Sequence, residues 1–179
     1  ARHMIGWDEL MRVIGVGYKR IELSDKERNV AACLQQAYKE VDERKSKVGT
    51  MVRLPEYDTD EIAVWKQTDG QLLVTVRGTK MNTKDLGADA QIAGGGEVRS
   101  SELETLLQTL NHAGDVYDLA GHSLATQYIQ NAARDGEAKN ADEFYLFNPA
   151  SSPFQSTEYL KEEANNPDFT WFIDRKSVV

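Results

Sequence analysis

The feature that most restricts the fold is an alternation of apolar and amphipathic segments from Leu72 onward. Short apolar runs, which predict strands, are separated by stretches with apolar residues at three- and four-residue steps, which predict helices. The expected strands span residues 72–77, 116–120, 144–147 and 169–173, and the expected helices span 101–110, 123–134 and 157–164. Such alternation is typical of a parallel sheet with right-handed crossovers. We therefore expect an α/β fold with a mostly parallel central sheet and helices on both faces.

The residues before this region predict two helices that pack on the sheet. Apolar residues recur at helical spacing between 7 and 21, although two glycines weaken this first helix. A second helix begins at a capping box, in which Ser24 and Glu27 satisfy each other's free backbone donors. Its expected buried stripe consists of Val30, Leu34, Ala37, Tyr38 and Val41. The charged run at 39–47 is interpreted as the solvated end of this helix.

A hairpin is expected between the second helix and the alternating region. Asp69-Gly70 lies between the apolar runs 62–66 and 72–77, and an Asp-Gly pair in that position favours a tight turn. Neither a linker nor a repeat divides the chain. We expect one domain over residues 5–179, preceded at 1–4 by a cloning scar and start.

Composition and charge exclude several classes of function. The formal net charge of −8, from 21 Lys and Arg against 29 Asp and Glu, disfavours nucleic-acid binding. No apolar run approaches the ~20 residues of a membrane span, and no signal peptide is evident. We expect a soluble protein, cytoplasmic or, if viral, virion-associated. Cys33 is interpreted as a buried apolar residue, and the few histidines show no metal-ligand spacing, so neither metal nor cofactor is expected.

One pentapeptide carries a chemical signal. Gly121-His122-Ser123-Leu124-Ala125 lies between an expected strand and an expected helix. This pattern is typical of a nucleophile elbow, a sharp turn that exposes a serine hydroxyl and crowds the backbone so that flanking residues are small. The alternative is an ordinary strand–helix turn with a capping serine. We favour the elbow, with Ser123 as the nucleophile.

A second segment is expected beside the elbow. The run 74–79 ends in Arg77-Gly78-Thr79, at the same edge of a parallel sheet as Ser123. The backbone N–H of Thr79, with that of Leu124, would form a two-donor pocket for a tetrahedral oxyanion. The alternative is a strand end whose arginine is solvated and whose glycine turns the chain.

Together these residues resemble the class 3 lipases, the fungal-lipase-like branch of the α/β-hydrolases. Three blocks over roughly residues 55–179 carry the resemblance: 76–79 with Asp85 and Asp89 a short way on, 119–125, and 147–153. The last block is most similar to lipase-like proteins of large DNA viruses. The resemblance implies an acyl-ester hydrolase with Ser123 as nucleophile, Thr79 and Leu124 as oxyanion donors, and Asp89 as the acid at the start of the lid.

The chain departs from the family in the lid and after the elbow. Residues 90–98, where these lipases carry an apolar lid helix, are short and rich in glycine. A soluble ester, thioester or amide is therefore as plausible a substrate as a lipid. Thr126 and Gln127 replace the small residues that usually follow the elbow.

The acid of the expected Ser–acid–His triad has two candidate positions. Asp174 ends the apolar run 169–173 at the correct edge of the sheet, and we favour it as the catalytic acid. The family pattern also aligns with residues 177–179, which would place Ser177 at the acid position. Asp168 is interpreted as a turn residue.

No histidine is placed to act as the base. His3 lies in the expected scar, His112 is expected at the edge of the sheet opposite Ser123, and His122 points away from its neighbour on a tight turn. The sequence ends at Val179 before the family's histidine, so we expect a domain truncated at its carboxyl end. Two hypotheses remain: a lipase-like or esterase-like serine hydrolase that is incomplete or inactive as this chain, and a non-catalytic module that retains the lipase fold.

Overall fold

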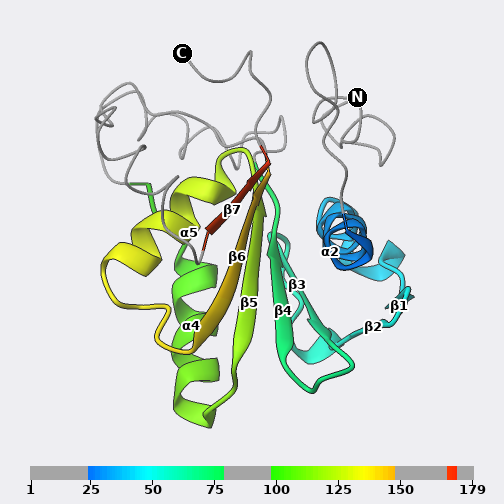
Figure 1. Cartoon of the computed structure of the whole chain (residues 1–179), viewed down its shortest axis with the longest axis horizontal. Helices are drawn as coiled ribbons and strands as arrows, with labels where there is room; N and C mark the ends of the chain where they lie inside the picture. The colour runs from blue at the N-terminus through cyan, green and yellow to red at the C-terminus, as the bar shows by residue number, and fades with distance from the viewer. Residues whose placement is uncertain (1–23, 79–97, 148–168, 173–179) are drawn as a thin grey trace.

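The computed structural model describes residues 24–78, 98–147 and 169–172, which form one seven-stranded sheet with helices on both faces (Figure 1). The strands lie in the sheet in their sequence order. They are β1 (Lys47–Val48), β2 (Met51–Arg53), β3 (Ile62–Lys66), β4 (Leu72–Val76), β5 (Tyr117–His122), β6 (Ala141–Phe147) and β7 (Phe169–Phe172). The helices are α2 (Asp25–Gln36), α4 (Ser101–Ala113) and α5 (Ala125–Arg134), with short 3-10 turns η1 (Val41–Glu43) and η2 (Pro55–Tyr57).

The sheet is mixed, so the expectation of a mostly parallel sheet is wrong for its first half. The pairings β1–β2, β2–β3 and β3–β4 are antiparallel, whereas β4–β5, β5–β6 and β6–β7 are parallel. The connections between the first four strands are too short for the crossover that parallel strands need, so these strands pair antiparallel. From β4 to β6 the predicted alternation is confirmed, and α4 and α5 connect successive parallel strands, whereas the helix expected at 157–164 lies outside the described residues.

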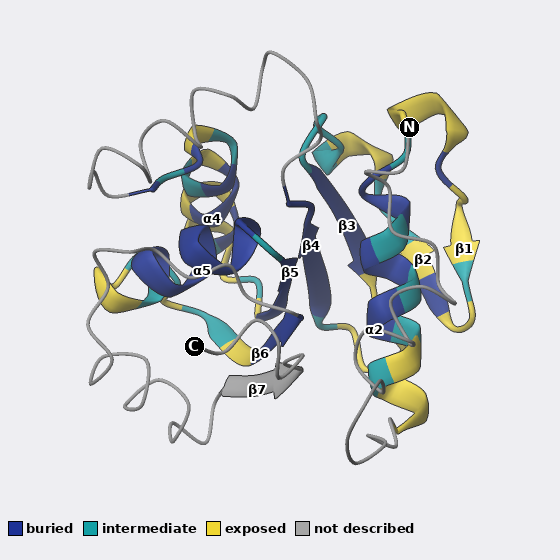
Figure 2. Ribbon diagram, turned by 90° about the horizontal axis from the view of Figure 1, so that it is seen from above, coloured by how far each residue is buried: buried dark blue, intermediate teal, exposed yellow. Residues whose placement is uncertain are grey.

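Alternate residues of the central strands supply two separate cores. Helices α4 and α5 lie on one side of the sheet and α2 on the other (Figure 2). Ile62 and Val64 of β3 face α4 and α5, whereas Ala63 and Trp65 face α2. This follows from the two-residue period of a strand, in which successive side chains point to opposite faces. Every residue of β5 is buried, as is typical of a parallel strand covered by helices on both faces. The prediction of helices on both faces is confirmed.

Helix α2 begins as predicted, but its end differs from the prediction. Ser24 accepts a hydrogen bond from the Glu27 N–H and the Glu27 side chain accepts one from the Ser24 N–H, which confirms the capping box. The helix ends at Gln36, and Val41, predicted to lie in its buried stripe, is 38% exposed in η1. Cys33 is buried as expected, and burial raises the pKa of its thiol.

The charged run at 39–47 is not simply a solvated helix end. Arg44 is buried and donates hydrogen bonds to the carbonyl oxygens of Ala37, Lys39 and Ile62. It also forms an ion pair of 3.3 Å with the buried carboxylate of Asp58. Arg44 therefore fixes the segment after α2 against the end of the sheet.

The β3–β4 hairpin and α4 match the predictions closely. Ile62 pairs with Val76 and Lys66 with Leu72 around a turn in which Gly70 has φ +87°. Helix α4 extends past the predicted end to Ala113, where Gly114, at φ +78°, closes it in a left-handed conformation. Among the described residues, no helix combines the length and apolar character needed to cross a membrane.

Candidate functional site

The predicted elbow is a sharp turn between a buried strand and a helix. Strand β5 ends at His122, two residues past the predicted end, and helix α5 begins at Ala125, two residues after the predicted start. Ser123, between them, has φ +56° and is the non-glycine residue with positive φ among the described ranges. An L-amino acid in this region is strained by roughly 1–3 kcal/mol, and such strain is concentrated at functional sites.

Position 121 requires a small residue because helix α5 packs closely against the end of strand β5. A Cβ atom at Gly121 would lie 2.6 Å from Cδ1 of Ile129 and 3.3 Å from the Ala125 carbonyl group. The first contact is with the end of a side chain, whereas the second is with helix backbone that cannot move independently. The expectation that a small residue precedes the serine by two positions therefore has a direct steric cause here.

The backbone of Ser123 is held by β6 and by the first turn of α5. Its N–H donates to the Phe147 carbonyl oxygen at 3.1 Å. Its carbonyl oxygen accepts from the Thr126 N–H at 3.1 Å and from Thr126 Oγ1 at 2.7 Å. Thr126 stands where the lipases that the chain resembles usually have a small residue. It is fully buried and connects helix α5 to the turn.

The polar atoms of the elbow are available for chemistry. The Ser123 side chain is half-buried, and its hydroxyl has no hydrogen-bond partner among the described residues. In the same part of the chain, no acceptor is found for the Leu124 N–H at the start of α5. A free N–H at a helix amino terminus carries partial positive charge and is suited to an anionic oxygen.

The end of β4 lies directly against the elbow. A Cβ atom at Gly78 would lie 2.6 Å from the His122 carbonyl oxygen and 3.0 Å from Cβ of Ser123. Only glycine permits this approach, because the nearest obstacle is backbone. The sequence prediction that the 74–79 segment lies beside the elbow is confirmed for its described part, which ends at Gly78.

Arg77 is buried, so the alternative of a solvated strand-end arginine is wrong. Its guanidinium donates to the Asp60 carbonyl oxygen at 2.9 Å and to the Gly78 carbonyl oxygen at 2.8 Å. It also pairs with the Asp60 carboxylate at 3.1 Å. Arg77 thus fixes the carbonyl of the glycine that follows it.

The His122 side chain contacts a tyrosine that follows helix α2. Its Nδ1 lies 2.5 Å from the hydroxyl oxygen of Tyr38, and the same hydroxyl accepts the Gly78 N–H at 2.8 Å. Burial lowers the pKa of His122 from 6.5 to about 4. Its Nε2 has no hydrogen-bond partner among the described residues. The sequence placed Tyr38 in a packing stripe, and nothing local to it indicated a polar partner.

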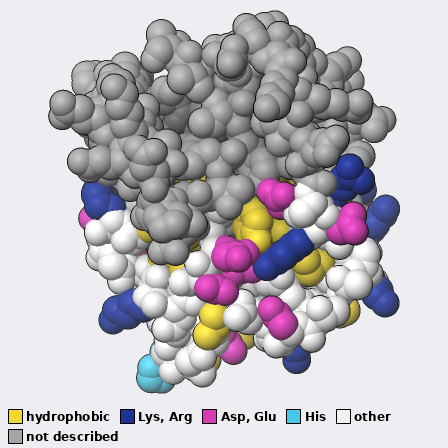
Figure 3. Space-filling view, viewed as in Figure 1, with side chains coloured by type: hydrophobic (Ala, Val, Ile, Leu, Met, Phe, Trp, Pro, Cys, Tyr) yellow, Lys and Arg dark blue, Asp and Glu magenta, His cyan; other side chains and the backbone are white. Residues whose placement is uncertain are grey.

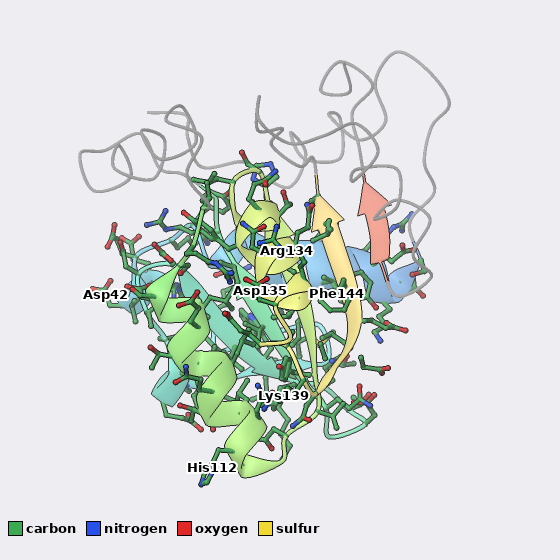
Figure 4. All side chains as sticks on the ribbon, turned by 90° about the vertical axis from the view of Figure 1, so that its left-hand side faces the viewer. Asp42, His112, Arg134, Asp135, Lys139 and Phe144 are labelled. Carbon is green, nitrogen blue, oxygen red and sulfur yellow. The ribbon has the colours of Figure 1, made fainter. Side chains whose placement is uncertain are left out.

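Neither described histidine is placed to be the general base of Ser123. His122 uses Nδ1 to contact Tyr38, and its ring makes an edge-on contact with the Tyr38 ring, with centroids 5.7 Å apart. His112 lies exposed in the last turn of α4, at the opposite end of the molecule from the arrowhead of β6 (Figure 4). That position is the one predicted from the sequence.

Several residues considered for the site lie outside the described ranges. They are Thr79, Asp85, Asp89, Asp174 and Ser177, together with His3 and Asp168, which were not favoured. The structure therefore brings together Gly78, Gly121, Ser123 and Leu124, while the second oxyanion donor and the triad acid stay predictions.

A second polar cluster surrounds Asp118 near the start of β5. Asp118 is fully buried and accepts from Gln67 Nε2 at 2.9 Å and from the Glu143 N–H at 3.1 Å, with Lys26 Nζ at 3.5 Å. Burial raises the pKa of Asp118, while the Gln67 bond and Lys26 oppose that effect. A pocket of about 270 Å³, lined in part by Lys26 and Gln67, opens beside it. Because each polar group here has a partner, the cluster ties α2 to the sheet.

The described residues show neither a surface of one charge (Figure 3) nor a cluster of metal ligands. On the face in Figure 3, acidic side chains lie between basic ones, in keeping with the net charge of −8. Within the described ranges, no three His, Cys, Asp or Glu side chains could together hold a metal ion. No protein-family model, curated protein or solved structure matches the chain.

Proposed function

We propose that this chain is a serine hydrolase domain of the lipase or esterase type, with an α/β-hydrolase-like fold and Ser123 as its nucleophile. The observation that carries the proposal is the positive φ of Ser123, at a turn between a buried parallel strand and a helix. A capping serine would not need this strained conformation, since N-cap residues have ordinary extended dihedrals. An elbow does need it, because the turn must hold the hydroxyl clear of the backbone.

The neighbouring groups support acyl transfer. Ser123 Oγ would attack an acyl carbonyl carbon, and the carbonyl oxygen would become an anion as the carbon becomes tetrahedral. The Leu124 N–H is available to stabilise that oxygen, and the resemblance assigns the second donor to Thr79. Collapse of the intermediate expels the alcohol or other leaving group, and water then releases the acid from the acyl-serine.

The base that accepts the Ser123 proton must come from outside the described residues. Asp174 is the residue we propose to orient it, because it follows the apolar run 169–173 in the sequence. The absence of a usable histidine among the described residues favours a second candidate function, a non-catalytic lipase-fold module for structure or interaction. Fold alone does not decide between the two.

A fluorophosphonate probe tests the nucleophile directly, because it forms a covalent bond only with an activated serine. Because the described residues supply no base, we expect slow labelling of the wild-type chain, located at Ser123 by peptide mass spectrometry, and none in Ser123→Ala. Ser100→Ala is the matched control: it removes the hydroxyl that caps α4 and should leave labelling unchanged. Absence of wild-type labelling, or equal labelling in Ser123→Ala, would overturn the proposal in favour of the non-catalytic module.

A further inference from the structure

Three elements that are distant in sequence meet at one hydroxyl group. Tyr38 follows α2, Gly78 follows β4 at a separation of 40 residues, and His122 ends β5 at a separation of 84 residues. The Tyr38 ring is only 3% exposed, so its hydroxyl is shielded from competing water. A hydrogen bond in such surroundings is stronger than one at the surface.

Both peptide units of Gly78 are held by side chains. Its N–H donates to Tyr38, and its carbonyl oxygen accepts from Arg77. Contacts at both the N–H and the carbonyl oxygen of one residue limit rotation about its two backbone dihedrals. They therefore restrict the backbone of Gly78, the residue before the position at which the resemblance places an oxyanion donor.

The backbone on both sides of Tyr38 is held by a buried arginine. Arg44 binds the carbonyl oxygens of Ala37 and Lys39, the residues on either side of Tyr38 in the chain. It is in turn held by Asp58. The position of the tyrosine hydroxyl is thus set by a buried ion pair as well as by packing.

One hydrogen bond of this group has a fixed direction: the Gly78 N–H donates to the Tyr38 oxygen. The donor in the contact between the Tyr38 hydroxyl and His122 Nδ1 is set by the tautomer of the imidazole. The low pKa of about 4 at His122 agrees with a neutral ring.

We infer that Tyr38 is a positioning residue for the oxyanion site of Ser123, holding the Gly78 backbone at a fixed spacing from the elbow through its hydroxyl. The inference rests on the proposed function. It assigns Tyr38 no contact with substrate. Its effect is on the rate of the step in which negative charge develops, and not on the binding that precedes it.

The test compares two buried tyrosines that each lose only a hydroxyl. Tyr38→Phe removes the contact with Gly78 and His122. The control Tyr117→Phe removes a 2.8 Å hydrogen bond to Asn111 at the other end of β5, roughly 17 Å along the strand from His122. The first-order rate of fluorophosphonate labelling and the concentration for half-maximal rate are measured separately for each. A loss of stability alone would affect both variants alike.

We expect Tyr38→Phe to slow the first-order labelling step about tenfold with an unchanged half-maximal concentration, and Tyr117→Phe to match the wild type. This is less than the hundredfold or more expected when an oxyanion donor is removed outright. Equal rates in Tyr38→Phe and wild type, or equal slowing in both variants, would overturn the inference while leaving the nucleophile intact. If the wild type does not label, the proposed function fails and the inference fails with it. Should Tyr38→Phe not fold, Arg77→Lys perturbs the same glycine and carries the same expectation.

Discussion

The buried state of His122 predicts a specific dependence of stability on pH. In the unfolded chain its pKa should be near 6.5, whereas in the folded protein burial lowers it to about 4. Between these values the unfolded chain binds a proton at this residue and the folded protein does not. The free energy of unfolding therefore rises with pH from 4 to 6.5 and levels off above it.

The size of this effect follows from the pKa difference. At about 1.4 kcal/mol per pH unit, the interval from 6.5 to about 4 corresponds to about 3 kcal/mol, lost as the pH falls through the window. This is a large fraction of the total stability of an ordinary domain. His122 is nine-tenths buried or more, so solvent does little to reduce it.

Urea denaturation at a series of pH values from 4 to 8 measures the effect, with His122→Asn as the comparison. Asparagine retains an oxygen that can accept the Tyr38 hydrogen bond but does not titrate. The wild type should gain about 3 kcal/mol more than His122→Asn across the window. The exposed His112→Asn is the matched control and should follow the wild type. Parallel curves for the wild type and His122→Asn, or a His122 NMR resonance that titrates near 6.5, would refute the reasoning.

Three further changes probe the turn itself. Gly78→Ala places a Cβ 2.6 Å from the His122 carbonyl oxygen, so thermal unfolding should show a loss of about 1–3 kcal/mol, and an unchanged midpoint would contradict the close approach. Thr126→Val removes a 2.7 Å hydrogen bond and should cost about 1 kcal/mol in urea, while the exposed control Thr109→Val should cost clearly less. Ser123→Gly relieves the φ of +56° and should be more stable than Ser123→Ala by about 1 kcal/mol; equal midpoints would mean that the turn is unstrained.

The parts of the fold that could be predicted are those whose signals are local. The capping box at Ser24 and the Asp69-Gly70 turn each lie within a few residues and appear where expected. The alternation from Leu72 predicted β4 to β6 and the helices between them because a buried strand and an amphipathic helix have different apolar periods. Errors there are confined to the ends of elements, where the chain frays or is capped.

The antiparallel strands that precede the predicted hairpin were beyond such signals. Strands β1 and β2 contain two and three residues, too few for a period to be visible. The burial of Arg44 could not be predicted from the sequence either. Its neighbours in the sequence are charged, which indicates solvent, but its actual partners are backbone carbonyls and Asp58, brought to it by the fold.

In the candidate site, too, some residues could be predicted from the sequence and others could not. Ser123 and Gly121 could be identified from the sequence because the elbow is a local turn whose steric demands fall on adjacent residues. The burial of Tyr38 was predicted, but its role was not, since tyrosine in an apolar stripe has the same pattern whether its hydroxyl meets water or a buried partner. The distinction depends on Gly78, which has no side chain to reveal that its N–H needs an acceptor. An interaction between a tyrosine hydroxyl and a backbone N–H thus leaves almost no trace in one sequence, although here it links the residue before the proposed nucleophile to the strand that would supply an oxyanion donor.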